Sequence, residues 1–179
     1  MNVTSQCLEL LRAVPLALAA ALFIMRPALA DDRWTPLDKG WEQYTNERFG
    51  TVAEVPRHFF KLVEPPPVNG DGREFRADDG ARLWVSGSYG PYAVTDGFQE
   101  YKAWLLEHAE FDRVTYKAEG QSWLVLSGPK GSTVVYRKVF EGCGAAHEVQ
   151  IEYPVERKAR YASIVARLSR SLGCNSPQS

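Results

Sequence analysis

The chain has 179 residues, and its 21 lysines and arginines nearly balance its 22 aspartates and glutamates, giving a formal net charge of −1 at pH 7. Proteins that bind nucleic acid carry a concentrated basic surface, so this balance indicates no nucleic-acid partner. Hydrophobic residues make up 45% of the chain, and the length suits one domain with a real core.

The first thirty residues have the layout of a secretory signal peptide. A basic segment precedes the apolar run Val14–Met25, and Ala28 to Ala30 form a small-residue cleavage motif. The run is shorter than the ~20 residues that span a bilayer. An uncleaved N-terminal anchor is the alternative, since signals and anchors differ mainly in apolar length. We expect cleavage after Ala30, a periplasmic or secreted location, and no stable membrane span afterwards.

The beginning of the mature chain is expected to be extended. Residues 31–40 are polar and predict an N-terminal arm. From Trp41 to Val55 the pattern indicates two short strands joined by a turn at Asn46–Gly50, and Pro56 ends the pairing because proline lacks the amide that a strand ladder needs. The segment Pro65–Gly72 combines three prolines with Asn-Gly and Asp-Gly steps, which predicts a stiff surface loop.

A hairpin, an irregular loop and a helix are predicted next. Strand-like segments at 73–77 and 81–86 flank Asp78-Asp79-Gly80, a strong hairpin signal. Gly87–Tyr92 follows as a glycine-rich loop. A helix is expected to begin at Asp96, which is placed to cap its free amides, with Gln99 completing a capping box.

The second half predicts an antiparallel meander and a final helix. Strands are expected at 112–118, 122–127, 132–140 and 146–153. In the last strand, His147, Val149, Ile151 and Tyr153 share one face and acidic or amide side chains share the other, as in an antiparallel sheet with one buried face. The final helix is predicted to open at Pro154 and to end at Gly173. Its apolar stripe consists of Tyr161, Ile164, Val165, Leu168 and Leu172.

Two cysteines, Cys143 and Cys174, remain after loss of the signal peptide and would enter an oxidising compartment. Roughly eight strand residues advance ~26 Å from Cys143, and roughly eighteen helical residues return ~27 Å. If the helix packs antiparallel to the strand, the cysteines meet. We predict a disulfide that closes a loop of about 32 residues and stabilises the fold by about 3–4 kcal/mol. A redox-active pair is the alternative, although such pairs are usually close in sequence.

Catalytic and metal-binding motifs are not found. The histidines His58, His108 and His147 occur in no zinc or protease pattern, and a hydrogen-bonded core histidine is the expected role of His147. There is no serine nucleophile elbow, and no carboxylate pair is visibly held in an apolar site. We therefore expect no catalytic residue, no metal site and no cofactor.

The segment Tyr44–Gly50 (YTNERFG), followed by Val55 and Pro56, resembles the opening hairpin of the PsbP-like superfamily. The later order of hairpin, helix, antiparallel meander and C-terminal helix is also similar, so the resemblance covers 41–172. It implies a central antiparallel sheet with helices packed against it, and an accessory or binding role without known catalysis. No functional residue of the family matches here. The Pro65–Gly72 insertion and the cysteine pair depart from the family pattern.

We expect an α+β fold with a central antiparallel sheet, made of a meander plus N-terminal hairpins and flanked by helices. The expected divisions are a signal peptide (1–30), an arm (31–40), one α+β domain (41–174) and a tail (175–179). The leading hypothesis is a non-catalytic periplasmic domain that binds a protein or a cell-envelope component. Its partner surface is predicted at the Pro65–Gly72 and Gly87–Tyr92 loops. The predicted residues are Arg73, Trp84, Tyr89 and Tyr92.

Two alternatives remain open. A hydrolase-type enzyme can assemble its site from residues that are distant in sequence, because a triad is recognised by geometry and not by chain order. A structural envelope protein would need no small ligand. The sequence predicts neither the ligand nor the oligomeric state.

Overall fold

The structure is a computed structural model that describes residues 32–175, so the predicted signal peptide and its cleavage site lie outside the described residues. The strands are β1 (Arg33–Pro36), β2 (Trp41–Asn46), β3 (Thr51–Pro56), β4 (Leu62–Val63), β5 (Gly72–Arg76), β6 (Arg82–Ser88), β7 (Tyr116–Glu119), β8 (Trp123–Lys130), β9 (Thr133–Gly142), β10 (Ala145–Pro154) and β11 (Gly173–Cys174). The helices are α1 (Gly90–Ala93), α2 (Phe98–Glu107) and α3 (Lys158–Ser171), with short 3₁₀ turns η1 (Asp38–Gly40) and η2 (Val155–Arg157).

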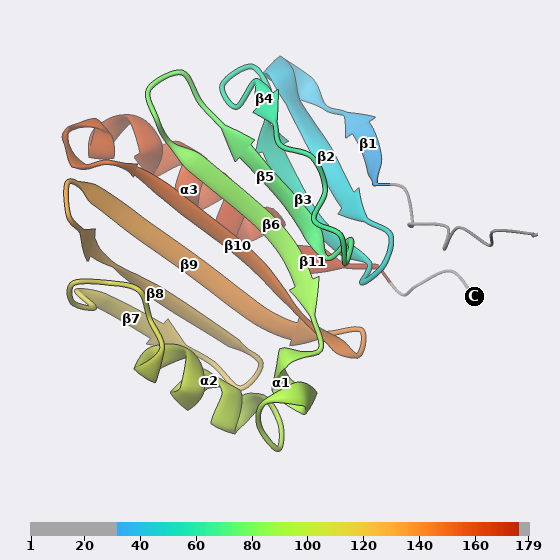
Figure 1. The fold of residues 1–179 in the computed structure, drawn as a ribbon. Helices are drawn as coiled ribbons and strands as arrows, with labels where there is room; N and C mark the ends of the chain where they lie inside the picture. Colours follow the sequence, from blue (N-terminus) through green and yellow to red (C-terminus); the bar gives the residue numbers. More distant parts are fainter. Residues whose placement is uncertain (1–31, 176–179) are drawn as a thin grey trace, which may run out of the picture.

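The strands form two antiparallel sheets (Figure 1). The larger sheet has seven strands in the order β4-β5-β6-β10-β9-β8-β7, and the smaller has four in the order β1-β2-β3-β11. The predicted α+β fold with a central antiparallel sheet is therefore confirmed. The N-terminal hairpin β2–β3, however, lies in the second sheet and not beside the meander. Residues 33–36 of the expected arm also belong to this sheet, as strand β1 paired with β2.

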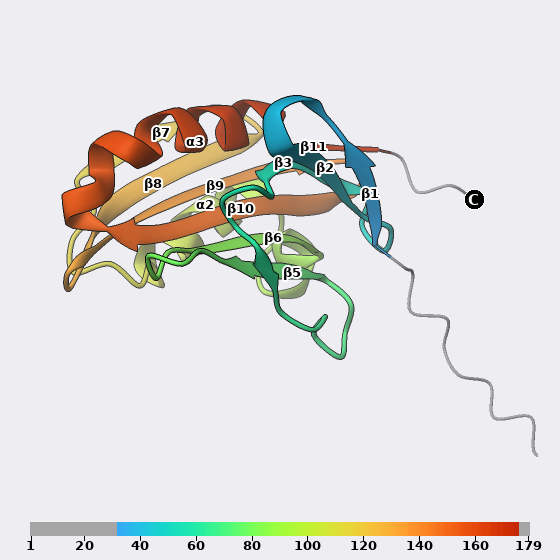
Figure 2. The ribbon, with the colours of Figure 1, turned by 90° about the horizontal axis from the view of Figure 1, so that it is seen from above.

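Helices cover both faces of the larger sheet. Figure 2 shows α3 and the smaller sheet on one face and α2 on the other. On the α3 face, alternate residues of β10 are buried, and Val149 and Ile151 pack in one core with Tyr161 and Leu168 of α3. The buried face predicted for β10 thus packs against the apolar stripe predicted for α3. On the opposite face, α2 buries a second cluster against β8 and β9.

The start of α2 differs from the prediction. The helix begins at Phe98, and Asp96 makes no side-chain cap. Instead, the Glu100 carboxylate accepts a hydrogen bond from the Asp96 backbone N–H at 3.2 Å, and the Gln99 amide donates to the carbonyl oxygen of Gln121 at 2.6 Å. The predicted capping box is wrong. The carboxylate of Glu100, one residue after Gln99, bonds the loop amide, and Gln99 bonds the β7–β8 turn instead of the helix start.

Several other boundaries are shifted. Gly87 and Ser88 continue β6, and a short helix α1 follows, where an irregular loop was predicted. The edge strand β7 begins only at Tyr116. Strand β10 runs through Pro154, because the next residue, Val155, donates its N–H to the carbonyl oxygen of Ser132 and prolongs the pairing with β9. The final helix therefore starts at Lys158 rather than at the proline.

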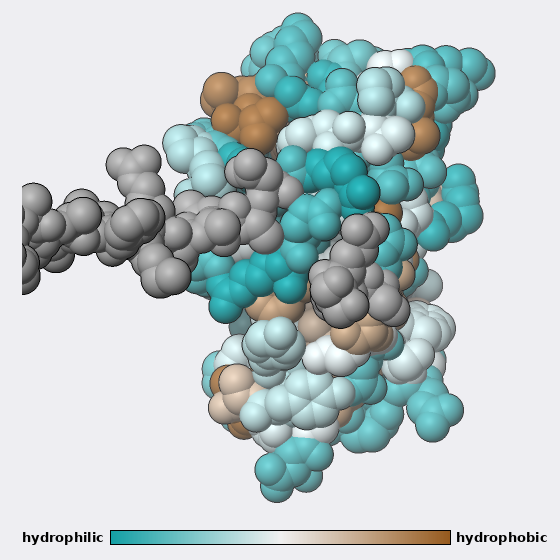
Figure 3. Space-filling view, turned by 90° about the vertical axis from the view of Figure 1, so that its right-hand side faces the viewer, coloured by the Kyte–Doolittle hydropathy of each residue, from teal (hydrophilic) through white to brown (hydrophobic). Residues whose placement is uncertain are grey.

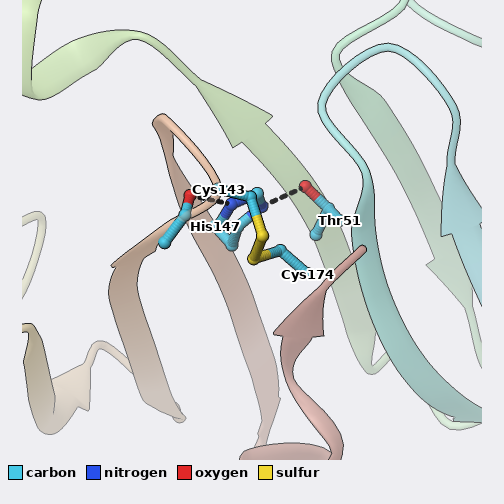
Figure 4. The surroundings of a disulfide bond; sticks show 5 residues. Thr51, Cys143, His147 and Cys174 are labelled. Carbon is cyan, nitrogen blue, oxygen red and sulfur yellow. Dashed lines mark hydrogen bonds between the residues drawn. A yellow bond between two sulfur atoms is a disulfide. The ribbon is translucent and has the colours of Figure 1, made fainter. Parts of the chain in front are cut away.

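The predicted disulfide is present. Cys143 lies in the turn between β9 and β10, Cys174 lies in β11, and their Cα atoms are 6.3 Å apart (Figure 4). Because β11 pairs with β3, the bond joins the larger sheet to the smaller one directly after α3. In the described range, no helix has the length and apolarity needed to cross a membrane.

Beside the disulfide, the two sheets meet at a close contact between Thr51 of β3 and His147 of β10 (Figure 4). Gly87 of β6 lies against Thr51, and we call these three residues the sheet joint. His147 lies opposite Gly87 in the ladder, and its Nδ1 lies 2.7 Å from Thr51 Oγ1. His147 Nε2 lies 2.8 Å from the carbonyl oxygen of Gly142. A carbonyl only accepts, so Nε2 carries the proton and the Thr51 hydroxyl donates to Nδ1.

Candidate functional site

A groove runs between helix α3 and strands β7, β8 and β9, on the α3 face of the larger sheet. We call it the α3 groove. Its volume is about 700 Å³, within the ~300–1,000 Å³ range of small-molecule sites. Its floor consists of Tyr116, Ala118, Ser122, Trp123, Val125, Tyr136, Lys138 and Phe140, and its wall of Ala162, Val165, Ala166, Ser169, Arg170 and Leu172.

The strand register explains the apolar floor. Strands β8 and β9 pair Trp123 with Phe140 and Val125 with Lys138, so these four side chains share the α3 face. Helix α3 packs on β10 and β3 and contacts β9, and the groove lies between α3 and the more distant strands β7 and β8. Trp123 and Phe140 are therefore only partly buried, and Tyr116 on β7 is 55% exposed.

Short side chains on one face of α3 leave space for the groove. Ala162, Ala166 and Ser169 recur at the three- and four-residue spacing that places side chains on one face of a helix. These short side chains line the groove, while Ile164 and Leu168 on the neighbouring face are buried in the core. The volume between α3 and the sheet thus follows from small residues on one helix face and aromatic residues on the strands.

Polar groups gather at Ser169. The Tyr136 hydroxyl donates to Ser169 Oγ at 2.8 Å, and the Lys138 ammonium donates to the Ser169 carbonyl oxygen. Burial lowers the pKa of Lys138 and raises the pKa of Tyr136, although the bond to Ser169 opposes the second shift. The part of the chain that the structure describes contributes two cations, Lys138 and Arg170, and no acid to the groove lining.

The predicted partner surface is not one surface. In the β5–β6 ladder Glu74 lies opposite Trp84, and Arg73 lies opposite Val85. Arg73 therefore points to the face of the buried core, where it pairs with the Asp32 carboxylate. Trp84 is on the other face, where its indole N–H donates to Glu74 Oε2 at 3.1 Å. The side chains of Arg73 and Trp84 thus leave the sheet on opposite faces, although both residues border one hollow of about 370 Å³ beside the Pro65–Gly72 loop.

The two predicted tyrosines do lie near each other, at helix α1. Tyr89 and Tyr92 are 55% and 59% exposed, the Tyr89 ring contacts the ring of Phe49, and the Tyr92 hydroxyl donates to the Glu141 carboxylate at 2.8 Å. Neither tyrosine lines the α3 groove. Figure 3 views the face that carries the smaller sheet, and this face is mainly hydrophilic, with small separate hydrophobic patches.

Metal-ligand groups and nucleophile–base pairs are the arrangements to consider for catalysis in residues 32–175. No group of three His, Cys, Asp or Glu side chains in this range is arranged to hold a metal ion. Thr51 and His147 form a hydroxyl–imidazole pair like that of a nucleophile and its base, but both residues have 0% exposure. A substrate therefore has no access to the pair, and His147 is the hydrogen-bonded core histidine that the sequence predicts.

The α3 groove was missed in the sequence because its signal is ambiguous. In β8 both sets of alternating residues are apolar, Trp123 and Val125 on one face and Leu124 and Leu126 on the other. Such a run indicates that both faces are covered, but not by what. The protein's own helix α2 covers Leu124 and Leu126, whereas α3 leaves the face of Trp123 partly open.

Comparison with known proteins gives no match by sequence: no family model and no curated protein matches the chain. Solved structures do match. The solution structure of cyanobacterial PsbP (CyanoP) from Synechocystis superimposes with a TM-score of 0.55, covering 76% of this chain and 93% of that chain at 12% identity. The fold is PsbP-like.

This result confirms at the level of fold the resemblance carried by the opening hairpin. The Saccharomyces cerevisiae Ran-binding protein Mog1p is a more remote match, with a TM-score of 0.43 and 11% identity over 81% of this chain and 96% of that chain.

Proposed function

We propose that this protein is a binding or accessory domain that works outside the cytoplasm and holds an apolar ligand in the α3 groove. The observation that carries the proposal is the aromatic floor of Trp123 and Phe140, which the described chain leaves partly uncovered. Concave, mainly apolar sites with a few polar groups are typical of ligand binding. The accessory and binding roles implied by the PsbP-like resemblance agree with this proposal.

The extracytoplasmic location rests on two features of the chain. Residues 1–30 have the layout of a signal peptide, and Cys143 and Cys174 form a disulfide. Structural disulfides persist in oxidising compartments and are rare in the cytosol of mesophiles. These features support a periplasmic or secreted location as part of the proposal.

The groove is tested with a neutral apolar dye, Nile red, whose fluorescence rises in an apolar site. The wild type should bind the dye saturably. Ala166→Phe places a large side chain into the groove and should weaken binding at least tenfold. Ala159→Phe makes the same change at an exposed position of α3 that does not line the groove, and it should bind like the wild type. Equal binding by all three proteins would refute the proposal.

A contact with a protein at Tyr89 and Tyr92 is a second candidate, favoured by their large exposure beside each other. The double variant Tyr89→Ala, Tyr92→Ala separates the two functions. It should leave Nile red binding unchanged, since neither tyrosine lines the groove. In a pull-down from envelope extract, it should lose partners that the wild type retains. Retention of every partner would remove the tyrosines from the proposal.

A further inference from the structure

The charged side chains that line the α3 groove are all cationic. Two cations, Lys138 and Arg170, line it, and no acid of the described chain does. This contrasts with the whole protein, in which acidic residues slightly outnumber basic ones. Elsewhere on α3 the usual pairing holds, since Arg167 bonds the carboxylates of Glu54 and Asp38.

Lys138 is already engaged, but only in part. Its ammonium donates to the carbonyl oxygen of Ser169, in the last turn of α3, where helix carbonyls lack intrahelical partners. An ammonium carries three N–H donors, so two remain. Burial alone lowers the pKa of Lys138, with no opposing contribution from a nearby carboxylate. An anionic group on a ligand in the groove would therefore stabilise the charged form of Lys138.

Arg170 is the second cation of the groove. It follows Ser169 directly, is exposed, and takes part in none of the ion pairs formed within residues 32–175. It also borders a smaller hollow beside Glu54, but the carboxylate of Glu54 is bonded to Arg167. A guanidinium binds a carboxylate through two parallel N–H donors, which Lys138 complements as a point charge.

Resting on the proposed function, we propose that the ligand is a single-chain amphiphile with a carboxylate head, a medium-chain fatty acid, whose chain lies on the aromatic floor and whose head binds Lys138 and Arg170. The groove wall from Ala162 to Arg170 is about 12 Å long, from ~1.5 Å per helical residue. This length and the volume of about 700 Å³ suit one acyl chain and not a folded partner.

The test compares two molecules that differ only in the head group. Dodecanoate and dodecanol compete with Nile red on the purified protein, below their aggregation concentrations and at a pH at which the acid is ionised. The wild type should bind dodecanoate about tenfold more tightly, the effect of one charge-assisted hydrogen bond. Arg170→Gln and Lys138→Met should each remove most of this preference without loss of dodecanol binding.

Controls separate the possible outcomes. Lys158→Gln removes an exposed cation of α3 outside the groove and should keep the preference. Arg170→Gln changes an exposed side chain, so it remains informative if Lys138→Met fails to fold. Equal displacement by acid and alcohol, or a preference kept in the Arg170 variant, overturns the carboxylate assignment and leaves the groove proposal intact.

Two further results are also decisive. A protein that binds Nile red and vesicles of anionic phospholipid, but not dodecanoate, recognises a membrane surface, and the inference is wrong. A protein that does not bind Nile red refutes the proposed function itself, and the inference fails with it.

Discussion

At the scale of single residues, His147 shows how a polar side chain is tolerated in an apolar core. Both ring nitrogens are hydrogen-bonded, to Thr51 and to the carbonyl oxygen of Gly142, and the residue has 0% exposure. Burial lowers its pKa below the usual 6.5, and the hydrogen bond to Gly142 only partly opposes this shift. The neutral ring is therefore part of the native packing.

The stability of the protein should consequently depend on pH through His147. The unfolded chain takes up a proton near pH 6.5, whereas the folded chain takes it up only at a lower pH. Protonation therefore favours the unfolded chain. Stability is complete above about pH 6.5, is lost as the pH falls, and levels off below the folded pKa.

Urea unfolding from pH 4.5 to 7.5 checks this dependence. The variant His147→Leu should have a flatter profile in that window, even if it is less stable throughout. Identical slopes for the wild type and His147→Leu would show that His147 does not couple folding to protons.

His147 also shows which residue-scale predictions succeed. Its position was predictable because strict alternation in β10 places it with Val149 and Ile151 on the buried face. Arg73 and Trp84, which were chosen as neighbours of the Pro65–Gly72 and Gly87–Tyr92 loops, both border one hollow, but strand alternation places their side chains on opposite faces. Strand alternation thus predicts the direction of a side chain, which proximity to a loop does not.

At the scale of elements, strand β11 depends on the rest of the molecule for its position. It contributes only two residues to the smaller sheet, and the disulfide fixes it to the turn before β10. The strand–helix lengths predicted this bond correctly, because α3 does return antiparallel to β10. No comparable signal exists for β1 or β11, because strands of two to four residues are too short to show a periodicity and are defined by their partners.

Removal of the disulfide should lower stability by about 3–4 kcal/mol, since the bond closes a loop with a sequence separation of 31. The double variant Cys143→Ser, Cys174→Ser and the reduced wild type should unfold at similar, lower urea concentrations. A loss below about 1 kcal/mol would mean that β11 and α3 are held mainly by noncovalent packing.

At the scale of the whole molecule, the two sheets are held together at the sheet joint. A Cβ atom at Gly87 would overlap the side chains of Phe49 and Thr51. The absence of a side chain at this position lets the smaller sheet approach closely enough for Thr51 to bond His147. A division into two sheets was not predictable from local patterns, because it depends on this contact between residues far apart in the chain.

Gly87→Ala should therefore destabilise the protein by about 1–3 kcal/mol, the usual cost of overpacking a core. Gly173→Ala is the matched control, because a Cβ there meets only the Ser171 carbonyl oxygen at 3.8 Å. The two variants are compared by urea unfolding monitored by tryptophan fluorescence. If they prove equally stable, the sheets can separate slightly at no cost, and the joint is less tight than the structure indicates.

The disulfide has a further consequence for survival among proteases. Cys143 and Cys174 enclose β10, η2 and α3 in one covalent ring. The exposed turn Val155–Arg157 lies inside that ring and offers trypsin-like proteases an arginine. A single cut there leaves the two fragments covalently joined, with the helix wall of the groove still attached to the sheet that forms its floor. A nicked molecule can thus remain a single covalent unit.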